Sequence, residues 1–223
     1  MARLARVIAP GFPHHVTQRG NRRMQTFLCD EDYQTYLELM SEWCRKCKVA
    51  VWAYCLMPNH VHLIAVPQSE DGLRRAVGEA HRRYTRSINF REGWRGHLWQ
   101  GRFASFPMDE RHLIAAARYI ELNPLRAGLV DELAAWRWSS LSAHLSGSDD
   151  LLVTAKPLLD LVGEWDEFVR DCAGDQDLET LRRHERTGRP LGSQDFVRLI
   201  EDAVGRMLKR RKPGPKSKRE PGS

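Results

Sequence analysis

The stretch CLMPNHVHLIAV, residues 55–66, decides the fold. Its Pro58-Asn59 pair separates two apolar segments, and such a pair is typical of a tight hairpin turn. Successive side chains of a strand point to opposite faces, so His60 and His62 should share one face of the second strand. The stretch therefore predicts two antiparallel strands, with a pair of imidazoles where the second strand begins.

Outward from this hairpin, the chain alternates between strand and helix patterns. Apolar residues at i, i+3, i+4 and i+7 predict amphipathic helices, and the order β, α, β, β, α, β, α suits an antiparallel sheet with helices on its faces. Because proline pushes the preceding residue out of the α region, the last of these helices should end at Asn123. The expected elements are strands over 14–20, 49–57, 60–66 and 98–108, and helices over 30–48, 73–88 and 110–123.

Charge and composition divide the chain into three parts. Residues 1–130 hold 19 Lys/Arg against 12 Asp/Glu, residues 131–180 hold 3 against 12, and residues 181–223 hold 13 against 5. Basic surfaces attract polyanions, nucleic acid above all. We expect one domain over 1–130, an acidic then mixed helical extension over 131–205, and a disordered basic tail over 206–223.

The same composition excludes several classes of protein. With 42% hydrophobic residues the chain can bury a core, and no apolar run is long enough to cross a bilayer. The first residues lack the apolar segment of a signal peptide, and five cysteines do not suggest a disulfide scaffold. These features favour a protein of the reducing cytosol that does not enter a membrane.

His60 and His62 are candidate metal ligands. Two imidazoles about 6–7 Å apart along one face of a strand can converge on one divalent cation. Imidazole suits Mn, Zn, Ni or Co better than Mg, although availability can decide which metal is bound. The alternative is a pair of hydrogen-bonded or solvent-facing histidines. Burying two imidazoles on an apolar strand without a partner would, however, cost free energy.

Tyr119 is the candidate nucleophile. It lies beside the apolar stripe of the helix expected over 110–123, where its hydroxyl could reach a site. A phenol ionises near pH 10, so it attacks phosphorus well only where a metal polarises the phosphate. Asn123, one turn later, offers a carbonyl oxygen as a third ligand. Two alternatives stand beside this hypothesis: Tyr119 anchors the helix with its ring, or Tyr84 is the nucleophile, although its place within an apolar stripe favours the core.

Four segments together resemble a known family, in the right order and over about residues 1–140. They are PHHVTQRGNRR (13–23), MPNHVHLI (57–64), LWQGRF (98–103) and RYIELNPLRAGLV (118–130). The ensemble resembles the single-tyrosine HUH transposases and is most similar to the bacterial REP-associated tyrosine transposases.

The resemblance implies a ferredoxin-like HUH endonuclease domain that nicks and joins single-stranded DNA through a 5′-phosphotyrosine. His60 and His62 match its metal pair, with Mg or Mn as the cofactor, and Tyr119 matches its nucleophile. Asn123 occupies the position of a third polar ligand. Palindromic repeats folded as single-stranded hairpins would be the DNA partner of a monomer or homodimer in the bacterial cytoplasm, at the nucleoid.

Polar and cationic side chains are candidate DNA contacts, because they can hold a phosphate backbone or splayed bases. Each of them could instead be an ordinary solvated residue. The candidates are His15, Thr17, Arg19, Asn21, Arg22, Arg23, Arg82, Arg83 and Arg102.

Two other functions are consistent with parts of this pattern. A catalytically silent hairpin-binding regulator would keep the fold and lose turnover. An unrelated metallohydrolase would need a third strong ligand and a nearby carboxylate, for which Glu121 is the only neighbour in the helix.

Overall fold

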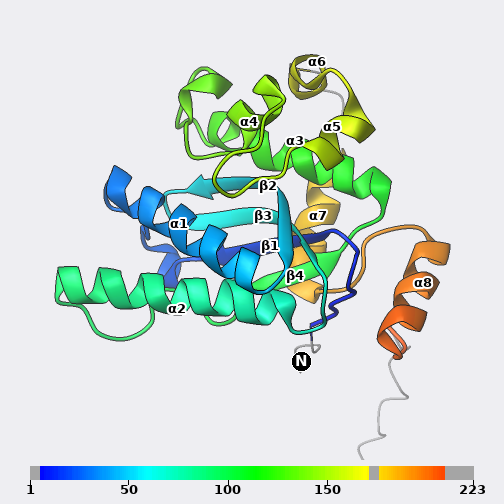
Figure 1. Cartoon of the computed structure of the whole chain (residues 1–223), viewed down its shortest axis with the longest axis horizontal. Coiled ribbons are helices and arrows are strands. Elements are labelled where there is room, and N and C mark those ends of the chain that lie inside the picture. Colours follow the sequence, from blue (N-terminus) through cyan, green and yellow to red (C-terminus); the bar gives the residue numbers. More distant parts are fainter. Residues whose placement is uncertain (1–5, 171–175, 209–223) are drawn as a thin grey trace, which may run out of the picture.

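The computed structural model describes residues 6–170 and 176–208, and its centre is a four-stranded antiparallel sheet (Figure 1). The strand order is β2-β3-β1-β4, with helix α1 between β1 and β2 and helix α2 between β3 and β4. This βαββαβ arrangement is the predicted ferredoxin-like α+β fold. The strands are β1 (His14–Arg19), β2 (Val49–Met57), β3 (His60–Pro67) and β4 (Ala104–Pro107).

Helices α1 (Asp30–Lys46) and α2 (Gly72–Glu92) lie side by side on one face of the sheet (Figure 1). Their predicted apolar stripes are buried: Tyr36 and Met40 of α1, and Tyr84 of α2, are fully enclosed. They pack against Leu63 and its neighbours on this face of β3. The helical periodicity therefore located the first core correctly.

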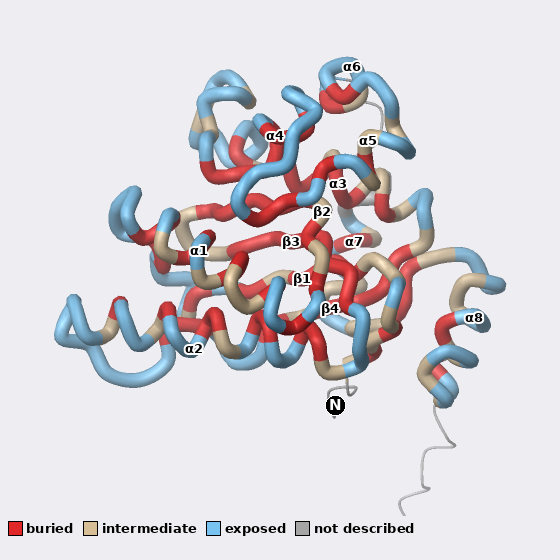
Figure 2. The backbone as a smooth tube through the Cα atoms, in the orientation of Figure 1, coloured by how far each residue is buried: buried red, intermediate tan, exposed pale blue. Residues whose placement is uncertain are grey.

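Helix α3 (Glu110–Arg126) covers the opposite face, where its Leu113 and Ile120 pack against Ile64 of β3 and Phe106 of β4. Because alternate residues of a strand share a face, His60 and His62 lie on this face with Ile64. Figure 2 shows the strands as the most buried part of the chain. The remaining helices are η1 (Asn21–Arg23), η2 (Leu133–Ala135), α4 (Leu141–Ser146), α5 (Lys156–Val162), α6 (Trp165–Arg170), α7 (Gln176–Thr187) and α8 (Gln194–Val204).

The segments that follow α3 also protect the edges of the sheet. Ser139 and Val153 form single bridges with the outer strand β2, and Leu191 forms one just after β4. Exposed strand edges invite pairing with other chains, so covering them protects the fold. The extension thus packs on the sheet domain; the division of the chain at residue 130 stays a prediction.

Two predicted boundaries are wrong. Helix α3 does not end before Pro124 but continues to Arg126, since a proline in the last turn removes only one hydrogen bond. The strand expected over 98–108 is limited to β4, because Gly101 adopts a left-handed backbone with φ 64°.

Within the described residues, no helix is long and apolar enough to span a membrane. The predicted basic tail lies outside the described residues from position 209 onward.

Candidate metal and nucleic-acid site

The pairing of β1 with β3 brings two rows of polar side chains onto the face that α3 covers. Their antiparallel register places Arg19 opposite His60 and Thr17 opposite His62. His15, two residues before Thr17, lies on the same face. Residues far apart in the sequence thus form one surface because neighbouring strands align them.

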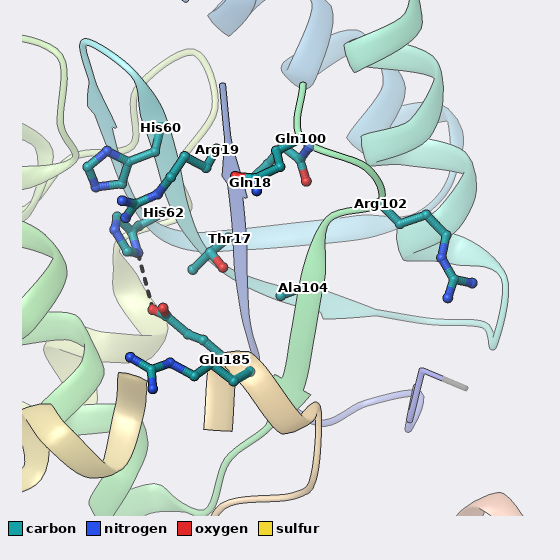
Figure 3. Close-up of a pocket in the computed structure, with 10 residues that line it drawn as sticks. Thr17, Gln18, Arg19, His60, His62, Gln100, Arg102, Ala104 and Glu185 are labelled. Atoms are coloured by element: carbon teal, nitrogen blue, oxygen red, sulfur yellow. Dashed lines mark ion pairs between the residues drawn. The ribbon is translucent and has the colours of Figure 1, made fainter. Parts of the chain in front are cut away.

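A cavity of about 310 Å³ opens over this surface (Figure 3). Strands β1 and β3, the loop before β4 and helix α7 line it. The chemistry of its walls is cationic and imidazole-rich, with one carboxylate. Its lining includes Thr17, Arg19, His60, His62, Arg102 and Glu185. A cavity with this lining suits an anion such as a phosphate group.

Asn59 orients the ring of His60. Its Oδ1 lies 2.6 Å from His60 Nδ1, and its Nδ2 donates to the backbone oxygen of Arg23 at 3.2 Å. An amide oxygen only accepts, so His60 carries its hydrogen on Nδ1 and keeps a lone pair on Nε2. Fixing the tautomer in this way is what an outer partner of a metal-binding histidine does.

His62 has a corresponding partner in His15, whose Nε2 lies 3.1 Å from His62 Nδ1. The other nitrogen of His62, Nε2, is buried without a hydrogen-bond partner among the described residues. The ring centroids of His60 and His62 are 4.9 Å apart. A buried orphan nitrogen beside a second imidazole fits the divalent metal expected here.

All three histidines are neutral at physiological pH. Burial, helped by Arg19, lowers the pKa of His60 to about 4, and burial lowers the pKa of His15 to about 3. Burial, with His60 as the next cause, holds the pKa of His62 well below its ordinary value. Metal ions bind neutral imidazole, so this electrostatic state suits the predicted ligands.

Tyr119 lies beside the histidines. Its ring meets that of His62 edge-to-face, with centroids 5.5 Å apart, and that of His15 at 6.3 Å. Its side chain is only 6% exposed and is not part of the cavity wall. The competing Tyr84 is buried on the other face of the sheet, where its hydroxyl donates to the backbone oxygen of Thr26 at 2.7 Å.

The two polar residues of α3 near Tyr119 have different surroundings. Asn123 is half-buried, and its side-chain nitrogen has no hydrogen-bond partner among the described residues. Glu121 is buried and accepts hydrogen bonds from the Ser140 hydroxyl and the Trp165 indole. Glu121 is therefore committed to the core and is not free to act as the acid–base group of a metallohydrolase.

Two members of the site were not predicted as such. Glu185 of α7 reaches into the cavity, and its Oε1 lies 3.9 Å from His15 Nδ1 and 4.0 Å from His62 Nδ1. Burial raises the pKa of Glu185 to about 7. Nothing in the local sequence marks Glu185, because only the packing of α7 brings it here. His15 was expected at the DNA surface but is fully buried. It lies two residues before Thr17 on β1, so strand alternation could have placed it on the same face of the sheet.

Three of the candidate DNA contacts, Thr17, Arg19 and Arg102, line the cavity. Thr17 is half-buried, while Arg19 and Arg102 are exposed at the cavity wall. Arg22 and Arg23 of η1 are exposed and both adopt a left-handed backbone, with φ 53° and 62°. Asn21, also in η1, is half-buried.

The other two candidates lie on α2, which covers the opposite face of the sheet. Arg82 pairs with Glu79 at 2.6 Å, and the Arg83 guanidinium lies 4.9 Å from the centre of the Trp43 ring. The structure therefore does not bring Arg82 and Arg83 to the histidines.

Comparisons with known proteins agree with this geometry. The model of the family described as "Transposase IS200 like" matches residues 11–123. A REP-associated tyrosine transposase of Escherichia coli (strain K12) is 25% identical over 121 residues, which make up 54% of this chain and 70% of that protein. A Haemophilus influenzae protein provisionally given the same description is 26% identical over 99 residues, or 40% of this chain and 56% of that protein.

The fold agrees as well. The solved structure of a REP-associated tyrosine transposase bound to a REP hairpin matches with a TM-score of 0.57 and 21% identity. The match covers 70% of this chain and 92% of that one. At this identity the likeness concerns the fold.

Proposed function

Because the chain belongs to the IS200-like transposase family, we propose that it nicks and rejoins single-stranded DNA with Tyr119 as the nucleophile. The observation that carries this is the edge-to-face contact of Tyr119 with His62, whose Nε2 is buried and unpartnered. A phenol beside a pair of neutral imidazoles, with a cationic cavity on the imidazoles' open side, supplies the groups that phosphoryl transfer by tyrosine needs.

In the proposed reaction the Tyr119 oxygen forms a bond to phosphorus, and the bond from phosphorus to the 3′-oxygen breaks. The product is a 5′-phosphotyrosine and a free 3′-hydroxyl. A divalent ion, Mg or Mn, held by His60 and His62 with Asn123 as a third ligand, would polarise the phosphate. Attack by a 3′-hydroxyl on the phosphotyrosine reverses the chemistry, so rejoining needs no ATP.

The proposed substrate is a single strand that folds as a hairpin. The structural relative is bound to a REP hairpin, and the cavity of this chain presents Arg19 and Arg102 to a phosphate backbone. Cationic side chains hold the backbone without reading its sequence. We propose palindromic repeats as the DNA class because a palindrome folds into a hairpin such as the one that the structural relative binds.

The test is the formation of a covalent adduct. The full chain is incubated with a hairpin oligonucleotide, labelled so that the tyrosine-linked piece is followed, and with Mn²⁺ or Mg²⁺. We expect a labelled band that survives denaturation for the wild type and for Tyr84→Phe, but not for Tyr119→Phe. An adduct with Tyr119→Phe would show that another residue is the nucleophile.

The second candidate is the catalytically silent regulator. The 6% exposure of the Tyr119 side chain favours it, because DNA does not reach a buried hydroxyl without rearrangement. The same assay separates the two candidates. The regulator would bind the hairpin but form no adduct in either metal, and a chelator would not change its affinity for the hairpin.

A further inference from the structure

A second group of metal-binding side chains lies around Nδ1 of His62, and Figure 3 shows its Glu185 on the side of His62 away from His60. It consists of His15 from β1, His62 from β3 and Glu185 from α7, and one ligand atom of each lies within 4.8 Å of the others. His15 Nε2 and His62 Nδ1 are 3.1 Å apart, and Glu185 Oε1 is 4.0 Å from the same His62 nitrogen. Three chain segments thus converge on one point.

The group contains polar atoms that the protein itself leaves unpaired. His15 Nδ1 and Glu185 Oε1 are both buried without a hydrogen-bond partner among the described residues. They lie 3.9 Å apart, which is too far for a hydrogen bond. Buried polar groups are nearly always paired, so two that face each other across a short gap indicate an absent ligand. We propose that His15, His62 and Glu185 bind a divalent transition-metal ion.

The spacing suits such an ion. Bonds of about 2.1 Å to a tetrahedral ion place its ligand atoms about 3.4 Å apart. Glu185 Oε1 lies 3.9 Å from His15 Nδ1 and 4.0 Å from His62 Nδ1, which is about half an ångström beyond this value, so small side-chain movements complete the site. Two imidazoles and one carboxylate favour Zn²⁺, Co²⁺ or Mn²⁺ over Ca²⁺, which prefers oxygen ligands.

This position and the one beside His60 exclude each other through His62. A neutral imidazole carries one hydrogen and offers one lone pair to a metal. Binding on the Glu185 side uses Nδ1 and moves the ring hydrogen to Nε2, which then has no lone pair for the position beside His60. An ion bound by Glu185 also fastens α7 to the sheet. The assignment rests on the geometry around Glu185 and does not require the DNA chemistry proposed above.

Cobalt titration of the full chain tests the second position, because the visible absorption of Co²⁺ reports its ligands and calorimetry reports its affinity. We expect Glu185→Gln to weaken Co²⁺ binding by at least about tenfold. Glu179→Gln, the same change on the exposed face of α7, should alter the affinity by less than about twofold. His60→Ala removes only the position beside His60, so this variant should still bind Co²⁺, and adding Glu185→Gln to it should abolish the remaining binding.

Wild-type affinity in Glu185→Gln would overturn the assignment, and so would complete loss of binding in His60→Ala. Circular dichroism melts show whether each variant is folded before it is titrated. Adduct formation by Tyr119 is measured separately, so failure of the second position and failure of the proposed function give different results.

Discussion

The side chain of Asn59 joins His60 to the turn that carries Arg23: its Oδ1 lies 2.6 Å from His60 Nδ1, and its Nδ2 donates to the Arg23 backbone oxygen at 3.2 Å. One amide therefore sets both the tautomer of a candidate metal ligand and the position of an exposed arginine. The turn itself admits little change, because a Cβ on Gly20 would lie 2.3 Å from the Met24 backbone oxygen.

Replacing Asn59 should weaken metal binding without unfolding the protein. Asn59→Ala removes the acceptor for His60 Nδ1, and loss of such an outer partner costs about 10–100-fold in metal affinity. Asn59→Asp keeps an acceptor oxygen and should retain an affinity close to the wild type, although it loses the donor to Arg23. Calorimetric titration with Mn²⁺ measures both variants. Equal losses in the two would show that the contact with Arg23, and not the His60 tautomer, matters.

The shared face of His60 and His62 could be predicted from the local sequence alone. Strand periodicity predicted that His60 and His62 share one face, and helix periodicity predicted that Tyr119 lies beside the apolar stripe of its helix. Each of these predictions needed only a short segment of sequence. Their mutual contact follows from the ferredoxin-like order, in which α3 crosses the face that bears His62. The roles proposed for these residues come from the family resemblance, because periodicity does not indicate function.

The DNA-binding surface should depend on Arg19 and not on Arg82. Arg19 is exposed at the cavity, whereas Arg82 lies on α2 beyond the sheet and is paired with Glu79. Each phosphate contact to a single strand contributes about 0.7 to the slope of log K against log salt concentration. We expect Arg19→Ala to lower this slope by about that amount, and Arg82→Ala to leave it unchanged, in hairpin binding measured by fluorescence anisotropy. A comparable drop with Arg82→Ala would place the path of the DNA across α2.

Buried neutral histidines should make the fold sensitive to acid, and His81 allows a clean test. Its Nε2 lies 2.8 Å from the Tyr36 hydroxyl, and burial lowers its pKa from 6.5 to about 3. Between these values the unfolded chain binds more protons than the folded one, so stability falls as the pH falls below 6.5.

His81→Gln keeps a hydrogen-bonding group for Tyr36 and removes this titration. From pH 7 to pH 4.5 the wild type should therefore lose about 2.5 kcal/mol more unfolding free energy than His81→Gln. Urea unfolding at a series of pH values measures the difference. Parallel curves for the two proteins would show that His81 does not carry the acid sensitivity.

The predictions that failed, or were not made, depend on tertiary structure. The end of α3 was misplaced because a proline in a final turn is tolerated when the following backbone is anchored: the Leu129 nitrogen donates to the Pro124 oxygen at 3.0 Å. Glu185 was missed because it reaches the histidines only through the packing of α7, well over 100 residues along the chain from β3. No local pattern encodes such a contact.

The buried carboxylate of Glu121 should be essential for the stability of the fold and for the packing of the extension on α3. It accepts hydrogen bonds from Ser140 and Trp165, and its Oε1 lies 2.5 Å from His144 Nδ1. These three partners belong to the extension, whereas Glu121 follows Tyr119 by two residues on α3. One side chain thus ties the extension to the helix that bears the proposed nucleophile.

Glu121→Leu removes the acceptor from all three partners and should cost at least about 3 kcal/mol of unfolding free energy. The exposed Glu110→Leu, on the first turn of the same helix, should cost no more than about 1 kcal/mol. Urea unfolding gives the two values, and hydrogen exchange shows whether α4 and α6 lose protection first. A loss below 1 kcal/mol for Glu121→Leu would contradict this role. It would mean that Ser140, His144 and Trp165 find other partners and that apolar packing alone holds the extension on α3.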